Sequence, residues 1–349
     1  MKRKFKHMVI PVLLVLATLL IVGCNTENEG IFMRISESVE KVDVGSINLI
    51  ANETGKIYSY ASKAGLQAYD PATKNWESIP GAGVRHYTFD GTNIVYATEA
   101  IFPDNNTLYT YDIGTKSHST WDDGHAVKAM SPKFNLMLLR TAADDFSVYS
   151  AAASAIEVPA LADFISEFVD EFPPNLVAFN DSTFLVSGNS PGDTTKYSHY
   201  YVSGGAPEAM TSSDATFEDN PLVAVGTDTA AIVAIDATGK VWKTAGSLSA
   251  FTSTTSITGF PERNPKNLPY PVFYYGGSLY LQNGDNDFYS VDVTNGAVSE
   301  VTLDFADTFS NIKIKSYLVD PLDSNKIYVG TMENGIYEIT MPAGTATDI

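Results

Sequence analysis

The sequence predicts an all-β protein, a seven-bladed β-propeller with one short inserted helix. Three observations predict this fold. Strand-like runs are separated by Gly, Asn, Asp and Pro, a unit of several such runs recurs along the chain, and helical periodicity is nearly absent. The runs are rich in Tyr, Phe, Val and Thr, which suit the pleated surface of a sheet.

The recurring unit consists of an inner apolar strand, two further strands and a more polar outer strand. We expect its third strand to be anchored by Tyr69, Tyr111, Tyr149, Tyr201, Trp242, Val291 and Ile339. The intervals between these anchors lie close to the 40–50 residues typical of a propeller blade. The repeat therefore predicts seven blades within residues 31–349.

The seventh copy predicts only three strands, which end with the run Gly335–Met341. A spare strand-like segment, Ile31–Ser36, precedes the first copy. Closing a propeller removes exposed lateral sheet edges. We therefore expect the last blade to be closed by this N-terminal strand.

Two insertions lengthen the repeat. The run Leu161–Phe172 places apolar residues on one helical face, and Pro173 and Pro174 follow it, which predicts one short helix. A Pro-rich stretch, Thr258–Tyr270, separates the fifth and sixth copies.

The first 23 residues have the pattern of an export signal, with a basic start, the apolar run Met8–Val22, and Gly23 before Cys24. The four residues Ile21–Cys24 resemble the bacterial lipobox. That resemblance implies cleavage before Cys24, a thioether-linked diacylglycerol on its sulfur, and usually an acyl chain such as palmitate on its amine. Two or more acyl chains give stable anchoring. Residues 24–30 are expected to form a polar tether.

Composition limits the partners. The formal net charge is −19, and it becomes −23 once the four Lys and Arg residues before Gly23 are removed. Such a surface repels phosphate backbones and anionic headgroups, so we expect no nucleic-acid partner and a membrane contact through the lipid on Cys24 only. Cys24 is the single cysteine, so no intramolecular disulfide forms.

Two blades resemble kelch repeats. Tyr69–Trp76 matches the kelch Tyr-Asp-Pro-x-Thr turn that leads to a Trp, and Gly276–Tyr280 with Val291–Thr294 keeps the same outline. The seventh copy, Asp320–Tyr337, resembles blades of sortilin-type and photosystem-assembly propellers. These resemblances imply a propeller fold and carry no active site.

No catalytic, metal or cofactor motif emerges from the sequence. His86, His118, His125 and His199 lack metal-ligand spacing, and no phosphate loop or nucleophile elbow is present. Acidic pairs such as Glu218-Asp219 are expected to be solvated turn residues. A carboxylate pair for glycan hydrolysis nevertheless stays open as an alternative.

The loops that lead into the inner strands of a propeller share one face. We expect this face to carry a candidate ligand site, because polar groups from several blades converge there. The alternative is that these residues cap turns. The candidates are Arg85, His86, His125, Asn175, Asn220 and Tyr270, with Asn311 and Lys313 beside the last inner strand.

These observations predict a lipid-anchored binding or scaffolding protein of the bacterial cell envelope, with a protein or glycan as its partner. We expect it at the cell membrane or outer membrane, facing the periplasm or the cell surface. A glycan hydrolase or lyase and a surface adhesin are the alternatives. A propeller fold by itself does not distinguish among these functions.

Replacement of the lipidated cysteine tests the export prediction. Cys24→Ser removes the thiol that accepts the diacylglycerol, so metabolic labelling with an alkyne fatty acid should fall to background and the unprocessed precursor should accumulate. Labelling that persists in the variant would contradict lipidation at Cys24.

Overall fold

The computed structural model describes residues 46–80, 83–98, 107–122, 126–131, 136–140, 146–150, 175–180, 183–190, 193–203, 206–228, 231–244, 250–260, 270–283, 287–301, 312–332 and 335–348. All of them belong to one compact unit, Val44–Ile349. Cys24, the segment Ile31–Ser36 and the expected helix Leu161–Phe172 lie outside the described residues. No helix in the described ranges is long and apolar enough to span a membrane.

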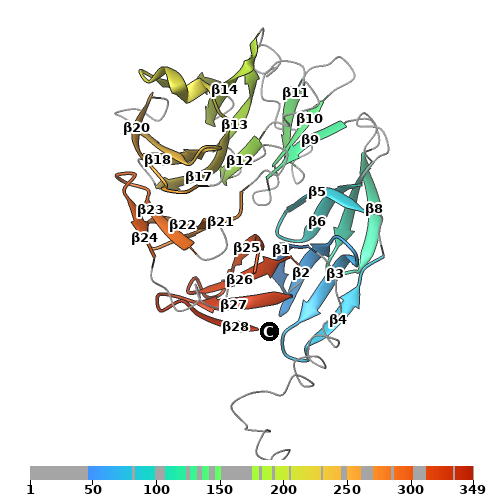
Figure 1. Cartoon of the computed structure of the whole chain (residues 1–349). Helices are drawn as coiled ribbons and strands as arrows, with labels where there is room; N and C mark the ends of the chain where they lie inside the picture. The colour runs from blue at the N-terminus through green and yellow to red at the C-terminus, as the bar shows by residue number, and fades with distance from the viewer. Residues whose placement is uncertain are drawn as a thin grey trace, which may run out of the picture. The chain divides into compact units, whose positions relative to one another are not determined.

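The described strands form seven largely antiparallel sheets arranged as blades in a ring, which confirms the all-β, seven-bladed prediction (Figure 1). Each of the seven predicted anchors lies in the third strand of its blade. The strands are, blade by blade, β1 (Ile47–Glu53), β2 (Lys56–Ala61), β3 (Gly65–Asp70) and β4 (Asn75–Ser78); β5 (Val84–Phe89), β6 (Asn93–Thr98), β7 (Leu108–Asp112) and β8 (Ser117–Asp122); β9 (Ala126–Met130), β10 (Leu136–Arg140) and β11 (Phe146–Ser150); β12 (Asn175–Asn180), β13 (Thr183–Ser190), β14 (Asp193–Ser203) and β15 (Ala206–Ala209); β17 (Leu222–Asp228), β18 (Ala231–Asp236), β19 (Lys240–Thr244) and β20 (Ala250–Ser256); β21 (Val272–Tyr275), β22 (Ser278–Asn283), β23 (Asp287–Asp292) and β24 (Val298–Glu300); β25 (Ile314–Val319), β26 (Lys326–Thr331), β27 (Ile336–Thr340) and β28 (Thr345–Asp348).

The prediction about the last blade was wrong. Its fourth strand is β28, which pairs with β27 from Tyr337↔Asp348 to Thr340↔Thr345. The C-terminal residues therefore occupy the place that the N-terminal segment was expected to fill. Because β28 is an outer strand of Thr, Ala and Asp, it lacks the apolar signal by which the other strands were found.

The connection from blade 4 to blade 5 also differs from the expected pattern. The unit was expected to hold four strands, but a further strand, β16 (Thr211–Ser212), pairs in parallel with β20 and so widens the sheet of blade 5. A short 3₁₀ helix, η2 (Ala215–Glu218), follows. Asp214 caps it and accepts hydrogen bonds from Thr216 N, at 3.1 Å, and from Lys240 Nζ of β19, at 2.6 Å. This network fixes the connection to the sheet of blade 5.

Seven clusters of buried apolar side chains form the core, one between each pair of neighbouring blades. The period of two in a strand produces this arrangement, because successive side chains point to opposite faces. In β2, Ile57 and Ala61 pack in the cluster shared with blade 7, whereas Tyr58 packs in the cluster shared with blade 2. Each blade therefore buries both faces of its sheet, and each face is buried against a neighbouring blade.

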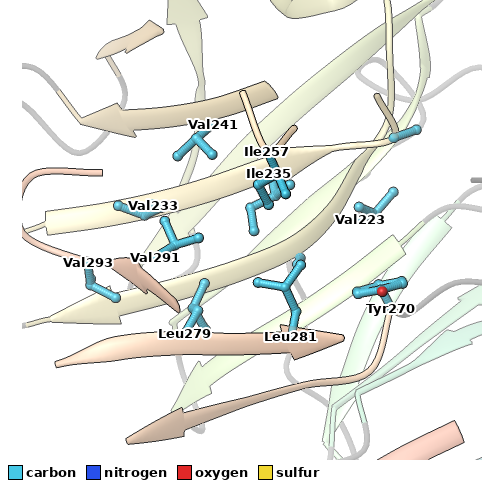
Figure 2. Packing of buried hydrophobic residues seen from close by; sticks show 12 residues of the cluster. Val223, Val233, Ile235, Val241, Ile257, Tyr270, Leu279, Leu281, Val291 and Val293 are labelled. Carbon is cyan, nitrogen blue, oxygen red and sulfur yellow. The ribbon is translucent and has the colours of Figure 1, made fainter. Parts of the chain in front are cut away.

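Figure 2 shows the cluster between blades 5 and 6, where Val233 and Ile235 of β18 lie across from Leu279 and Leu281 of β22. Gly226 of β17 permits this approach, because a Cβ atom there would lie 2.7 Å from the Leu279 side chain. Full burial of each such aliphatic side chain contributes about 1.5–3 kcal/mol.

The ring closes where blade 7 meets blade 1. Ser316 Oγ of β25 donates a hydrogen bond to the Ile47 carbonyl and accepts one from Leu49 N–H, both at 2.9 Å. Gly330 of β26 lies against the same backbone, since a Cβ atom there would be 2.5 Å from the Ile47 carbonyl oxygen. An isolated bridge, Ser46↔Met332, adds a further contact. Among the described residues, backbone contacts and side-chain packing therefore close the ring, and no strand from the N-terminal part of the chain pairs into the sheet of blade 7.

A buried histidine lies between blades 4 and 5. His199 Nδ1 is 2.7 Å from Ser187 Oγ, and its Nε2 is 3.1 Å from the Phe217 carbonyl oxygen. A carbonyl oxygen only accepts, so Nε2 carries a proton. Burial lowers the pKa of His199 to about 4, so the ring is neutral at pH 7, and Nδ1 then accepts from the serine.

Substitution of Gly330 tests the closure. Gly330→Ala should lower the free energy of unfolding by about 1–3 kcal/mol, because the new methyl group collides with the Ile47 carbonyl. Gly83→Ala is the matched control, since nothing lies within 4 Å of a Cβ atom at Gly83. Urea unfolding of both variants measures the difference. Equal stability of the two would contradict the close contact between blades 7 and 1.

Acidification tests the buried histidine. The folded pKa of about 4 lies below the ordinary value of 6.5, so the unfolded chain binds the proton more readily. The contribution of neutral His199 should be fully present above pH 6.5 and lost as the pH falls toward 4, a change of about 3 kcal/mol. Urea unfolding across this pH range should show a shallower dependence for His199→Gln than for wild type. His118→Gln is the control, because His118 is less buried. If the free energy of unfolding depends equally on pH in all three proteins, the assignment of a buried, neutral His199 is refuted.

Candidate functional site

The inner strands β1, β5, β9, β12, β17, β21 and β25 all begin on one side of the ring, because every blade starts with its inner strand. We call the positions where they begin the amino-terminal rim. Neighbouring inner strands contact one another along the series β21, β25, β1, β5, β9, β12 and β17. The candidate residues from successive blades therefore belong to one continuous series of strands.

Two predicted residues lie within described inner strands but have no described side chain. Arg85 is the second residue of β5, and Asn175 is the first residue of β12, where it pairs with Ser187. His86 is half-buried in β5 and pairs with Ala97. His125 and Asn311 lie outside the described residues.

Three predicted residues lie at the starts of later inner strands. Asn220 is half-buried between η2 and β17, and Lys313 is exposed just before β25. The Lys313 carbonyl accepts a hydrogen bond from Met332 N–H at 2.9 Å, which ties the strand start to a loop of the same blade. Tyr270 is buried in the cluster between blades 5 and 6, and its hydroxyl donates to the Gln282 carbonyl. Tyr270 therefore stabilises the wall between two blades.

The sequence did not reveal that six of the seven inner strands contain a β-bulge. A bulge places one extra residue opposite the partner strand, and it can redirect a side chain at a functional site. The extra residues are Ile50, Arg85, Lys128, Phe179, Val223 and Lys315. Lys128 and Lys315 were not among the predicted site residues, because a bulge leaves no mark in the apolar pattern of a strand.

Aspartates that end the third strands of three blades cap the turns that follow. Asp70 Oδ1 accepts from Ala72 N at 2.9 Å, Asp112 Oδ1 from Thr115 N at 2.7 Å, and Asp292 Oδ1 from Thr294 N at 2.8 Å. Hydrogen bonds from Thr73 and Thr115 hold the pKa values of Asp70 and Asp112 below their ordinary range. All three carboxylates thus serve as turn caps.

Several lysines form ion pairs within a blade or between neighbouring blades. Glu77 of β4 accepts from Lys56 and Lys116, each at 2.6 Å, and these two bonds, that of Lys116 first, lower its pKa to about 2. Lys240 pairs with Asp214 at 2.6 Å, and Lys326 with Glu338 at 3.3 Å.

Lys196 of blade 4 pairs with Asp219, one of the acidic residues that the sequence singled out. Every carboxylate of the described residues whose pKa is clearly shifted has it lowered. A general acid needs the opposite shift. Within the described ranges, no group of three His, Cys, Asp or Glu side chains could hold a metal ion.

Comparison with known proteins shows the fold alone. No family model matches the chain, and a search of curated proteins finds no significant match. Three solved structures are similar at 11–12% sequence identity. A structure described as YCF48 bound to D1 peptide has a TM-score of 0.56 over 87% of this chain and 94% of that chain. A structure of U3-55K has a TM-score of 0.53 over 82% and 89%, and YCF48 from Cyanidioschyzon merolae one of 0.51 over 86% and 97%.

Proposed function

We propose that this chain is a binding or scaffolding propeller of the bacterial cell envelope, anchored by lipid on Cys24, which holds a segment of a partner protein at its amino-terminal rim. The observation that carries the proposal is the rim itself. Seven inner strands that are packed against their neighbours present strand starts from separate blades on one side.

Rigidity favours binding at such a rim. Each blade is fixed on both faces by an apolar cluster, so a partner finds its contact groups already in position. Binding to a preorganised surface avoids the entropic cost of ordering side chains and loops. A ring of strand starts can therefore contact one segment of a partner from several blades together.

A similar fold supports the choice of a peptide segment. The structure described as YCF48 bound to D1 peptide is a propeller with a peptide ligand. At 12% identity that likeness extends to the fold, so the ligand of this chain has to be argued from its own residues. The described carboxylates do not favour a glycan-cleaving site in the same way. Those with clearly shifted pKa values are ionised turn caps or partners in ion pairs.

Crosslinking on intact membranes tests the proposal. Native protein, purified after brief crosslinking, should retain a specific protein partner that mass spectrometry identifies. The Cys24→Ser variant should retain less of it, because the loss of the lipid removes the protein from the membrane surface. Recovery of wild-type protein without a specific partner would overturn the scaffolding function.

A further inference from the structure

Two polar side chains lie in the wall between blades 7 and 1. Side chains two residues apart in a strand share one face of the sheet. Ser59 of β2 therefore faces the same apolar cluster as Ile57, and Gln67 of β3 faces it with Tyr69. Ser59 is fully buried, and Gln67 is 4% exposed. Both polar groups thus stand among the aliphatic and aromatic side chains that join the two blades.

Each of these side chains has a buried polar atom without a hydrogen-bond partner. Among the described residues, nothing bonds to Ser59 Oγ or to Gln67 Nε2, although both atoms are shielded from solvent. A buried polar atom left unpaired carries its full desolvation penalty, and such atoms are rare in folded proteins. The two atoms therefore point to a further group that binds between them.

Strand register brings the two side chains together. Ser59 and Gln67 are directly paired across β2 and β3. The Cβ atoms of residues paired in this way lie about 4.5–5.5 Å apart on one face of the sheet. Both side chains can therefore reach one small molecule, although Ser59 Oγ forms no hydrogen bond with the Gln67 amide.

Small residues flank the pair on the side of the amino-terminal rim. The next paired positions of the same two strands hold Ala61 and Gly65. A Cβ atom at Gly65 would have no neighbouring atom within 4 Å. A single methyl group, that of Ala61, is thus the only side chain at these two positions, which leaves room beside Ser59 and Gln67.

Blade 4 contains a polar pair that satisfies itself. Ser187 and His199 are also directly paired on the second and third strands of their blade. Their side chains bond to each other at 2.7 Å, and the second ring nitrogen of His199 reaches the Phe217 carbonyl oxygen. The pair in blade 1 forms neither kind of bond among the described residues, so its polar atoms need a partner from outside the chain.

We infer that Ser59 and Gln67 bind one water molecule inside the wall between blades 7 and 1. The water oxygen accepts a hydrogen bond from Gln67 Nε2, and the water exchanges a second hydrogen bond with Ser59 Oγ. Buried waters typically bind polar groups that the protein leaves unpaired, and two to four partners hold them. An ion matches the site less well, because neither side chain carries a charge. The inference does not depend on the proposed function.

The water takes part in closing the ring. Leu49 of β1 pairs with Ser59, and its N–H donates to Ser316 Oγ of blade 7. The water site is therefore on the strand next to the hydrogen bonds that join blade 7 to blade 1. It adds polar contacts to a junction that apolar packing otherwise dominates.

A high-resolution crystal structure of the full-length protein, grown from detergent, tests the inference directly. Density for one ordered water is expected within about 3.2 Å of both Ser59 Oγ and the Gln67 amide. A direct hydrogen bond between the two side chains, or a wall without density between them, would overturn the inference.

Urea unfolding of three variants supplies a second, independent measurement. Ser59→Ala and Gln67→Met each remove one partner of the water and leave the other polar group poorly satisfied. Each should raise the equilibrium constant for unfolding about tenfold. The double variant removes both polar groups and makes the wall apolar, so its unfolding constant should rise less than that of either single variant.

Thr88→Val is the matched control. Thr88 Oγ1 of β5 is likewise buried and unpaired, but the residue paired with it is Val95, so a water there would lack a second polar partner on the adjacent strand. Replacement of this single hydroxyl by a methyl group should leave the unfolding constant unchanged or lower it. Equal losses in Ser59→Ala and Thr88→Val, or additive losses in the double variant, would rule out a water shared by Ser59 and Gln67.

Discussion

Packing between blades is the constraint on which the rest of the structure depends. A four-stranded sheet with apolar side chains on both faces is not stable alone in water, because each face needs a neighbour to exclude solvent. Only a ring supplies two neighbours to every blade. The fully buried Trp242 and Ile57 belong to such shared clusters, so the stability of each blade depends on the next.

The same constraint determines where polar side chains can lie. Some polar groups within the walls have defined partners, such as His199 between Ser187 and the Phe217 carbonyl. Carboxylates are used at turns and outer strands, where they cap backbone N–H groups or pair with lysines.

The sequence was sufficient to predict the class, the number of blades and the third strand of every blade, because buried strands of period two have a strong apolar signal. It misplaced the closure because the outer strand β28 consists of small, mostly polar residues, which resemble a loop. At the candidate site, topology alone placed His86, Asn220 and Lys313 correctly near the starts of inner strands. The bulges at Lys128 and Lys315, and the burial of Tyr270, depend on strand register and on contacts between blades, which periodicity does not encode.

The position of β28 in its own blade has a consequence for how such a ring can change. Because blade 7 is built from one uninterrupted stretch of chain, Ile314–Asp348, its boundaries in the gene coincide with its boundaries in space. Duplication or loss of such a stretch would add or remove a whole sheet without leaving a neighbour short of a strand. The junction between blades 7 and 1, joined by packing and a few hydrogen bonds, is then the natural point at which the ring could admit another unit during evolution.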